Sequence, residues 1–177
     1  MGGKPMIRLA TEHDLAAIAA IYDEILDHEA ATVSYTNWVK GKYPCRATAE
    51  NALQKGWLYV MEEDGQAVAT AILNHEQLPE YDKLPWQYPA AGDEVFVIHT
   101  LCVPPSQAGH GRARAFVAFA EELGREKGST VVRLDTYEGN EPALTMYPRL
   151  GYRTVGKTMF HFQNLIWENL TCFEKQL

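Results

Sequence analysis

A glycine-rich turn between an apolar segment and an amphipathic segment constrains the fold of this chain more than any other feature. Residues 95–103 form the most apolar run of the sequence and predict a central strand. The turn 104–111 follows, with glycines at 109 and 111. Apolar positions at helical spacing then predict a helix that ends before Gly128: Ala113, Phe116, Val117, Ala120 and Leu123. A strand, a turn and a helix in this order are typical of a sheet covered by helices.

The same turn predicts an anion site. Gly109 and Gly111 permit a tight turn and a close approach of the backbone to a ligand. A helix N-terminus offers unpaired N–H groups and a partial positive charge, which together suit a phosphate. Arg112 and Arg114 add local positive charge. A plain connection between a strand and a helix is the alternative interpretation of the turn when it is taken alone.

Two nucleotide-binding motifs fit this turn less well. A P-loop requires a Gly-Lys-Ser/Thr ending, and the turn has none. A dinucleotide fingerprint requires a third glycine at the position of Arg114. Asp135, at the end of the next expected strand, supplies the acid that such a fingerprint uses for a ribose. A nucleotide-dependent oxidoreductase is therefore a weakened alternative that stays open.

Length and charge set broad limits. The chain has 177 residues, with 16 Lys and Arg against 23 Asp and Glu, a formal net charge of −7. This length fits one domain, which we place at residues 4–177, and Met1–Gly3 resemble a remnant of cloning. The acidic balance argues against a nucleic-acid partner, because such binding depends on clustered Lys and Arg. No apolar run is long enough for a membrane span, so we expect no membrane partner.

Cysteine and histidine usage indicates a reducing compartment and no metal. Cys45, Cys102 and Cys172 are odd in number and lack a CxxC spacing, so we expect free thiols and a cytoplasmic location. Cys102 is expected to be a buried small hydrophobe. The six histidines show no HxxxH or HExxH pairing, which predicts no metal site.

The remaining pattern predicts a mixed α/β (α+β) sheet. Expected strands are residues 6–9, 57–61, 67–73, 95–103, 131–134, 151–155 and 160–173. Expected helices are an apolar face from Leu15 to Leu26, then residues 47–55, 113–123 and 140–150. Asp64-Gly65 predicts a hairpin between two of these strands. Thr11 and Asp14 have the spacing of a capping box before the first helix. Residues 75–92, which hold three prolines and three large aromatic residues, form a long loop.

A second motif lies downstream of the glycine turn. With it, the chain resembles the GNAT superfamily of acyl-coenzyme A-dependent N-acetyltransferases. The family pattern V-x-P-x-x-[RQ]-G-x-G-x-[GA] is matched at Val103, Pro105, Gly109, Gly111 and Ala113, and the pattern N-x-x-A-x-x-x-Y-x-x-x-G-[FY] at Asn140, Ala143, Tyr147, Gly151 and Tyr152. Ala108 stands where the family has Arg or Gln, and Arg112 where Ile is usual. The resemblance implies a mostly antiparallel sheet of about seven strands flanked by about four helices.

The resemblance also implies the site residues. Acetyl-CoA would be held by Leu101, Cys102, Val103, Ala108, Gly109, His110, Gly111, Arg112, Ala113, Arg114 and Asn140. The main chain of Leu101 and Val103 would pair with the pantetheine arm. Asn140 would cap its helix and contact the coenzyme. Tyr147 takes the place of the general acid, since a phenol is a sensible proton donor to a thiolate.

The general base has two candidates on the central strand. His99 is the first, because an ordinary histidine titrates near neutral pH, and its position is similar to that of a strand histidine in arylalkylamine N-acetyltransferases. Glu94, acting through water, is the second. A satisfied core histidine is the alternative interpretation of His99. Strand alternation predicts that Glu94 and His99 face opposite sides unless a bulge intervenes, and that Cys102 faces away from His99.

These features predict an acetyl-CoA-dependent N-acetyltransferase. The acceptor would be a primary amine of a small molecule or a peptide, attacking directly, because no nucleophile elbow is present. A cationic amine is modestly favoured by the acidic chain. A non-catalytic acyl-CoA-binding or sensing module on the same fold is the main alternative. A homodimer is compatible with the resemblance.

Overall fold

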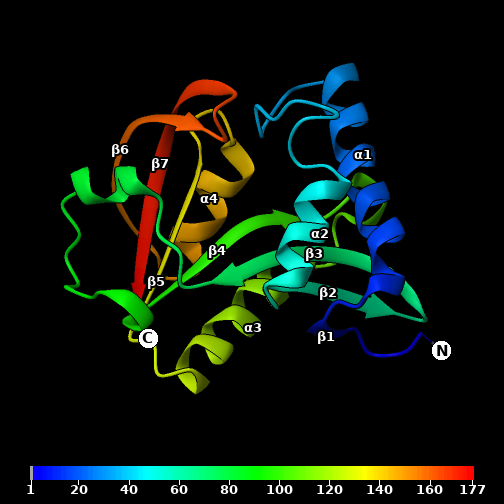
Figure 1. Cartoon of the computed structure of the whole chain (residues 1–177), viewed down its shortest axis with the longest axis horizontal. Helices are drawn as coiled ribbons and strands as arrows, with labels where there is room; N and C mark the ends of the chain where they lie inside the picture. Colours follow the sequence, from blue (N-terminus) through cyan, green and yellow to red (C-terminus); the bar gives the residue numbers. More distant parts are fainter. Residues whose placement is uncertain (1) are drawn as a thin grey trace. The chain divides into compact units, whose positions relative to one another are not determined.

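The computed structural model describes residues 2–177. Met1, part of the expected cloning remnant, lies outside the described residues. The helices of the described part are α1 (Leu15–Ala31), α2 (Arg46–Gln54), α3 (Arg112–Glu126) and α4 (Glu141–Arg149). The strands are β1 (Met6–Leu9), β2 (Leu58–Glu63), β3 (Gln66–Asn74), β4 (Val95–Cys102), β5 (Val131–Tyr137), β6 (Arg153–Phe162) and β7 (Ile166–Gln176) (Figure 1). Their order along the chain confirms the predicted succession.

The sheet topology also confirms the expected fold class. The seven strands follow the order β1-β2-β3-β4-β5-β7-β6. β1 with β2, β2 with β3, β5 with β7 and β6 with β7 are antiparallel pairs. β4 runs parallel to β5, with Val95–Val97 opposite Val131–Arg133. The sheet is therefore mixed and mostly antiparallel.

The chain forms two compact units from interleaved segments. The first unit contains residues up to 34, 38–73 and 99–119, and the second contains 35–37, 74–98 and 120–177. No helix within residues 2–177 combines the length and the apolar character that crossing a membrane requires.

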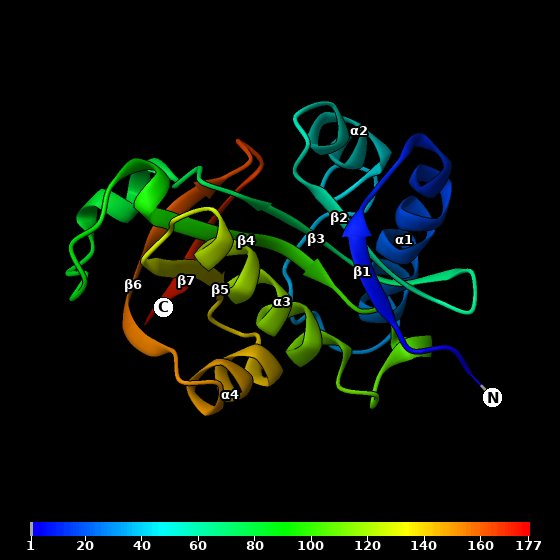
Figure 2. The same cartoon turned by 90° about the horizontal axis from the view of Figure 1, so that it is seen from below.

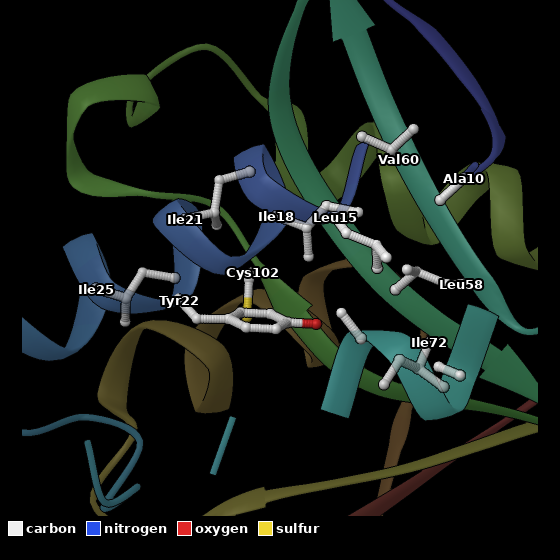
Figure 3. Close-up of a cluster of buried hydrophobic side chains, with 12 residues drawn as sticks. Ala10, Leu15, Ile18, Ile21, Tyr22, Ile25, Leu58, Val60, Ile72 and Cys102 are labelled. Atoms are coloured by element: carbon white, nitrogen blue, oxygen red, sulfur yellow. The ribbon is translucent and has the colours of Figure 1, made fainter. Parts of the chain in front are cut away.

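In the first unit, helices cover both faces of β2 because its side chains alternate. Leu58 and Val60 point into a buried cluster with Ile18 and Tyr22 of α1 (Figure 3). Tyr59, between them, contacts the ring of Phe119 in α3, with ring centroids 5.7 Å apart. Figure 2 shows α1 and α2 on one side of β1 and β2. Because β2 is buried on both faces, its sequence is an uninterrupted apolar run from Leu58 to Met61.

In the second unit, α4 and the long loop 75–92 pack on residues that alternate along β7. Leu170 and Cys172 belong to a buried cluster with Tyr81 of the loop. Phe173, the next residue, contacts Tyr147 of α4, with ring centroids 5.5 Å apart. The position of Tyr147 is thus fixed by ring packing on the sheet.

Buried charges anchor the long loop. Arg133 of β5 donates to Gln77 Oε1 at 2.7 Å and to the carbonyl of Tyr88 at 2.8 Å. Glu174 of β7 is fully buried and accepts from the backbone N–H of Gln87 at 2.7 Å. Glu174 also pairs with Arg153 at 2.9 Å. Contacts of Gln77, Gln87 and Tyr88 therefore tie the loop to the sheet.

One predicted strand is wrong. Residues 160–173 do not form a single strand, because β6 and β7 pair as a hairpin that turns between Phe162 and Ile166. Gln163 and Asn164 adopt left-handed conformations, with φ of 52° and 54°. Left-handed residues at both central positions suit a tight hairpin turn, and Asn tolerates that conformation. The turn lacks glycine and proline, which is why the sequence pattern did not reveal it.

Candidate active site

The glycine turn has the open backbone that was predicted for it. Gly109 and Gly111 have φ of +83° and +70°, in the left-handed region that favours glycine. A Cβ added at either residue would meet no atom of residues 2–177 within 4 Å. Glycine is therefore required by the backbone conformation, not by crowding within the protein. The space beside the turn suits the close approach of a ligand, and both glycines are exposed.

Arg112, which was predicted to add positive charge beside the turn, has its charge paired within the protein. Its side chain is buried, and Nη2 donates to Glu63 Oε2 at 2.5 Å and to Gln107 Oε1 at 2.9 Å. The sequence does not reveal this pairing, because Glu63 is distant in sequence and carries no local signal. Contact of the Arg112 main chain with acetyl-CoA stays a prediction. Arg114 is exposed and makes no ion pair with any residue of the described chain. Arg114 is therefore the available cation next to the turn.

Strand β4 carries a backbone irregularity beside His99. Thr100 has φ of +49°, although it lies within the strand and is β-branched. A left-handed conformation at such a residue is uncommon and costs about 1–2 kcal/mol. Its hydroxyl hydrogen-bonds to the hydroxyl of Tyr43. The simple alternation that separated His99 from Cys102 therefore does not apply here. His99 and Leu101 are half-buried.

Cys102 is buried as expected. It lies in the apolar cluster beside Tyr22 and Ile18 (Figure 3). Burial raises the pKa of its thiol, so the sulfur stays protonated and weakly reactive. All three cysteines of the chain are free. The side chain of Cys102 serves packing, and a contact from its main chain to acetyl-CoA stays a prediction.

Glu94 lies outside the strand to which it was assigned. It ends a 3₁₀ turn at Gly92–Glu94, and β4 begins at Val95. The Glu94 side chain is exposed, and its carboxylate accepts from the backbone N–H of Ala91 at 2.9 Å. The first residue of this turn, Gly92, adopts a left-handed conformation, with φ of 56°. Glu94 therefore caps its own turn, and its role as a base stays a prediction.

Asn140 caps α4 with both ends of its amide. Its Oδ1 accepts from the backbone N–H of Ala143 at 3.2 Å. Its Nδ2 donates to Thr136 Oγ1 at 3.0 Å. The predicted cap is confirmed, and it fixes the start of the helix that carries Tyr147. Contact of Asn140 with the coenzyme stays a prediction.

Tyr147 is buried between two aromatic rings of the second unit. Its ring lies 5.4 Å from that of Tyr152 and 5.5 Å from that of Phe173. Burial raises the pKa of its phenol, and the charge of Asp135 adds to the effect. No residue in the described part of the chain accepts a hydrogen bond from the hydroxyl. Because its pKa is raised, the phenol keeps its proton at neutral pH. Because the hydroxyl has no acceptor in the described chain, that proton is available to donate to a ligand.

Two carboxylates of the second unit interact with each other, and the sequence pattern did not predict that interaction. Asp135 accepts from the hydroxyl of Tyr81 at 2.6 Å, and Glu168 accepts from Asn37 Nδ2 at 2.8 Å. Burial raises the pKa of Asp135 to about 6 and that of Glu168 to about 7. The charge of Asp135 raises the pKa of Glu168 further. The available signal was a carboxylate inside an otherwise apolar strand.

The predicted site residues divide between the two units. His99, Leu101, Cys102, Val103 and residues 108–114 belong to the first unit. Glu94, Asn140 and Tyr147 belong to the second. Within residues 2–177, no group of three or more His, Cys, Asp or Glu side chains is placed to hold a metal ion. The absence of a metal cofactor stays a prediction.

Comparison with known proteins agrees with this geometry. The model of the acetyltransferase (GNAT) family matches residues 18–152, more than half of the chain. The chain belongs to this family. The match includes both motifs quoted above and Tyr147. No curated protein matches the chain.

Solved structures share the fold at low sequence identity. A GNAT family acetyltransferase from Streptococcus agalactiae has a TM-score of 0.81 and 22% identity, over 98% of this chain and 95% of that one. One from Listeria monocytogenes has a TM-score of 0.76 and 20% identity, over 98% and 95%. The yncA protein of Salmonella typhimurium, solved with its cofactor acetyl-CoA, has a TM-score of 0.67 and 20% identity, over 99% and 95%.

Proposed function

We propose that this chain transfers the acetyl group of acetyl-CoA to a primary amine of a small molecule or a peptide, by direct attack of the amine on the thioester. The observation that carries the proposal is the glycine turn at the start of α3. Two left-handed glycines leave open space there, and α3, with its unpaired first N–H groups, begins at the next residue, Arg112. Such an arrangement binds phosphate without a dedicated basic side chain. Membership of the acetyltransferase family supports the same donor.

On the donor side, backbone groups do most of the binding. The N–H groups of residues 109–113 would hold the pyrophosphate, and exposed Arg114 would add charge. The main chain of Leu101 and Val103 would pair with the pantetheine arm, as the family resemblance implies. Ala108, where the family has Arg or Gln, contributes only its backbone.

Proton movement is assigned to two side chains. As the amine nitrogen bonds to the acetyl carbon, the bond between that carbon and sulfur breaks, and the sulfur takes the proton of the Tyr147 hydroxyl. The amine proton passes to His99, which is half-buried on β4. Glu94, acting through water, is the alternative base. The net charge of −7 favours a cationic amine as the acceptor.

A panel of amines tests the proposal. Purified protein is mixed with acetyl-CoA and each amine in turn, and the release of free thiol is measured. The panel contains polyamines, aminoglycosides and peptides with free N-termini. Thiol release with at least one amine is expected. Tight binding of CoA with no release for any amine would identify a sensing module, and preferential binding of NAD(H) would identify an oxidoreductase.

Replacing Gly111 with Ala should weaken coenzyme binding more than it weakens folding. The left-handed conformation costs Ala about 1 kcal/mol of stability. Crowding adds no further cost, because the new Cβ meets no atom of residues 2–177 within 4 Å. The new methyl group would fill space that the proposal gives to the phosphates, so the Kd for CoA should rise about tenfold. Calorimetric titration with CoA measures the change.

Gly41→Ala is the matched control for this substitution. Gly41 lies in the same unit and has φ of +74°, and an added Cβ there would also meet no atom of the described chain within 4 Å. Its substitution should carry the same folding cost and leave the Kd for CoA unchanged. Equal effects of the two substitutions on that Kd would remove the turn from the binding site.

Replacing His99 with Ala should remove the acidic limb of the rate profile. A histidine base is inactive when protonated, so kcat/KM of the wild-type chain should fall toward low pH. His99→Ala should lower kcat/KM at neutral pH by about 10²-fold and flatten this limb. The profile is measured by thiol release with the best amine of the panel. An acidic limb that survives the substitution would exclude His99 as the general base and favour Glu94. Glu94→Gln then tests Glu94 by the same measurement.

A further inference from the structure

One buried guanidinium joins the three elements that meet at the glycine turn. Arg112 is the first residue of α3, Gln107 is the last residue of the preceding 3₁₀ turn, and Glu63 ends β2. Arg112 Nη2 lies 2.5 Å from Glu63 Oε2 and 2.9 Å from Gln107 Oε1. The Arg112 side chain is 7% exposed and that of Glu63 is 27% exposed. We refer to these three side chains as the Arg112 clamp.

The clamp spans the flexible part of the turn. Residues 108–111 lie between Gln107 and Arg112, and they contain the two left-handed glycines. Glycine has more conformational freedom than any other residue, so this segment has little rigidity of its own. The bond from Arg112 to Gln107 connects its two ends, and the bond to Glu63 fixes both to the sheet.

The charge of Arg112 is already balanced. Its ion pair with Glu63 is largely shielded from water, and separating it would leave a buried charge unpaired. The Nε atom of Arg112 is buried and has no hydrogen-bond partner in the described chain. Both hydrogen bonds that the guanidinium makes within residues 2–177 come from Nη2, and Glu63 is the one charged acceptor among the described residues.

We propose that Arg112 is a positioning residue: through Glu63 and Gln107 it holds residues 108–111 in the conformation that presents backbone N–H groups to the phosphates of acetyl-CoA. It makes no direct contact with those phosphates. The inference rests on the proposed donor. It also explains how a turn with Ala108 in place of the usual Arg or Gln keeps a rigid cradle, since a preorganised backbone loses less freedom on binding.

Glu63→Gln separates positioning from direct phosphate binding by the sign of its effect. If Arg112 bound phosphate directly, removing the carboxylate would free its charge and tighten CoA binding. If Arg112 positions the turn, the same substitution loosens the clamp, and we expect the Kd for CoA to rise about tenfold. Calorimetric titration of the full chain with CoA measures the Kd.

Glu62→Gln is the matched control. Glu62 precedes Glu63 on the same strand and pairs with Arg8 at 2.6 Å, so its substitution makes the same change in net charge without touching the clamp. We expect its Kd for CoA to stay within twofold of the wild-type value. Arg112→Lys, which keeps a cation beside Glu63, should bind CoA more tightly than Arg112→Met. Tighter or unchanged binding in Glu63→Gln overturns the proposal, as does an equal loss in Glu62→Gln.

Amide hydrogen exchange tests the clamp without any coenzyme. Two N–H groups at the ends of this segment are hydrogen-bonded: that of Ala108 donates to the carbonyl of Pro105 at 3.2 Å, and that of Ala115 donates to the carbonyl of Gly111 at 3.0 Å. Exchange of these two N–H groups should be faster in Glu63→Gln than in the wild-type chain or in Glu62→Gln. Unchanged exchange at these residues would overturn the clamp. Failure of the wild-type chain to bind CoA would instead refute the proposed donor, so the two failures are distinguishable.

Discussion

Tyr147→Phe should lower kcat by about 10³-fold and leave the KM for acetyl-CoA nearly unchanged, because the substitution removes only the proton donor. The ring packs on Tyr152 and Phe173, and Phe keeps that packing. The Tyr147 hydroxyl has no hydrogen-bond acceptor within residues 2–177, so its loss leaves no buried group unsatisfied. Steady-state thiol release with the best amine measures both constants, and the melting temperature should not fall.

Tyr152→Phe is the matched control for this experiment. Its ring touches that of Tyr147, and its hydroxyl donates to Glu121 at 3.1 Å. Glu121 keeps Lys175 as a partner at 2.9 Å, so the substitution should cost stability and leave kcat within about threefold. A Tyr147→Phe variant with full kcat would give the role of general acid to another group or to water.

The elements with local signals were predictable from sequence. Asp64-Gly65 identified the β2–β3 hairpin, because a left-handed Gly is typical of such turns. The strand 95–103, the glycine turn 104–111 and the helix after it were also placed correctly, because apolar runs and glycines are local signals. The β6–β7 hairpin was missed because its turn uses Gln163 and Asn164 in place of glycine.

Tertiary partners were not predictable in this way. Arg112 was predicted to add positive charge beside the turn, and its pairing with Glu63 depends on the meeting of β2 with the start of α3. The left-handed Thr100 has no sequence signature, since β-branched residues normally favour extended strands. Hydrophobic periodicity reports which face of an element is buried, but it does not report which charges meet there.

Asp135→Asn should stabilise the folded chain at neutral pH by about 3 kcal/mol, and have little effect near pH 4. Burial raises the pKa of Asp135 to about 6 from an ordinary value of 3.8. Between these two values the folded state holds a proton that the unfolded state has released. The free energy of unfolding therefore falls as pH rises through this window, and above it the full penalty of a buried charge remains. Asn keeps an acceptor for the Tyr81 hydroxyl and carries no charge.

Urea unfolding at a series of pH values measures this effect. The wild-type free energy of unfolding should decline between pH 4 and pH 7, because the pKa of Glu168 is raised to about 7 and extends the window. Asp135→Asn should flatten the lower part of the decline, and it should also lower the pKa of Glu168 by removing a neighbouring charge. Asp82→Asn, which removes an exposed carboxylate from the same unit, should leave the slope unchanged. A slope between pH 4 and pH 7 that is the same in Asp135→Asn and in the wild-type chain would show that the pKa of Asp135 is not raised. The carboxylates with lowered pKa values, Asp14 and Glu138, contribute equally to both proteins and cancel in this comparison.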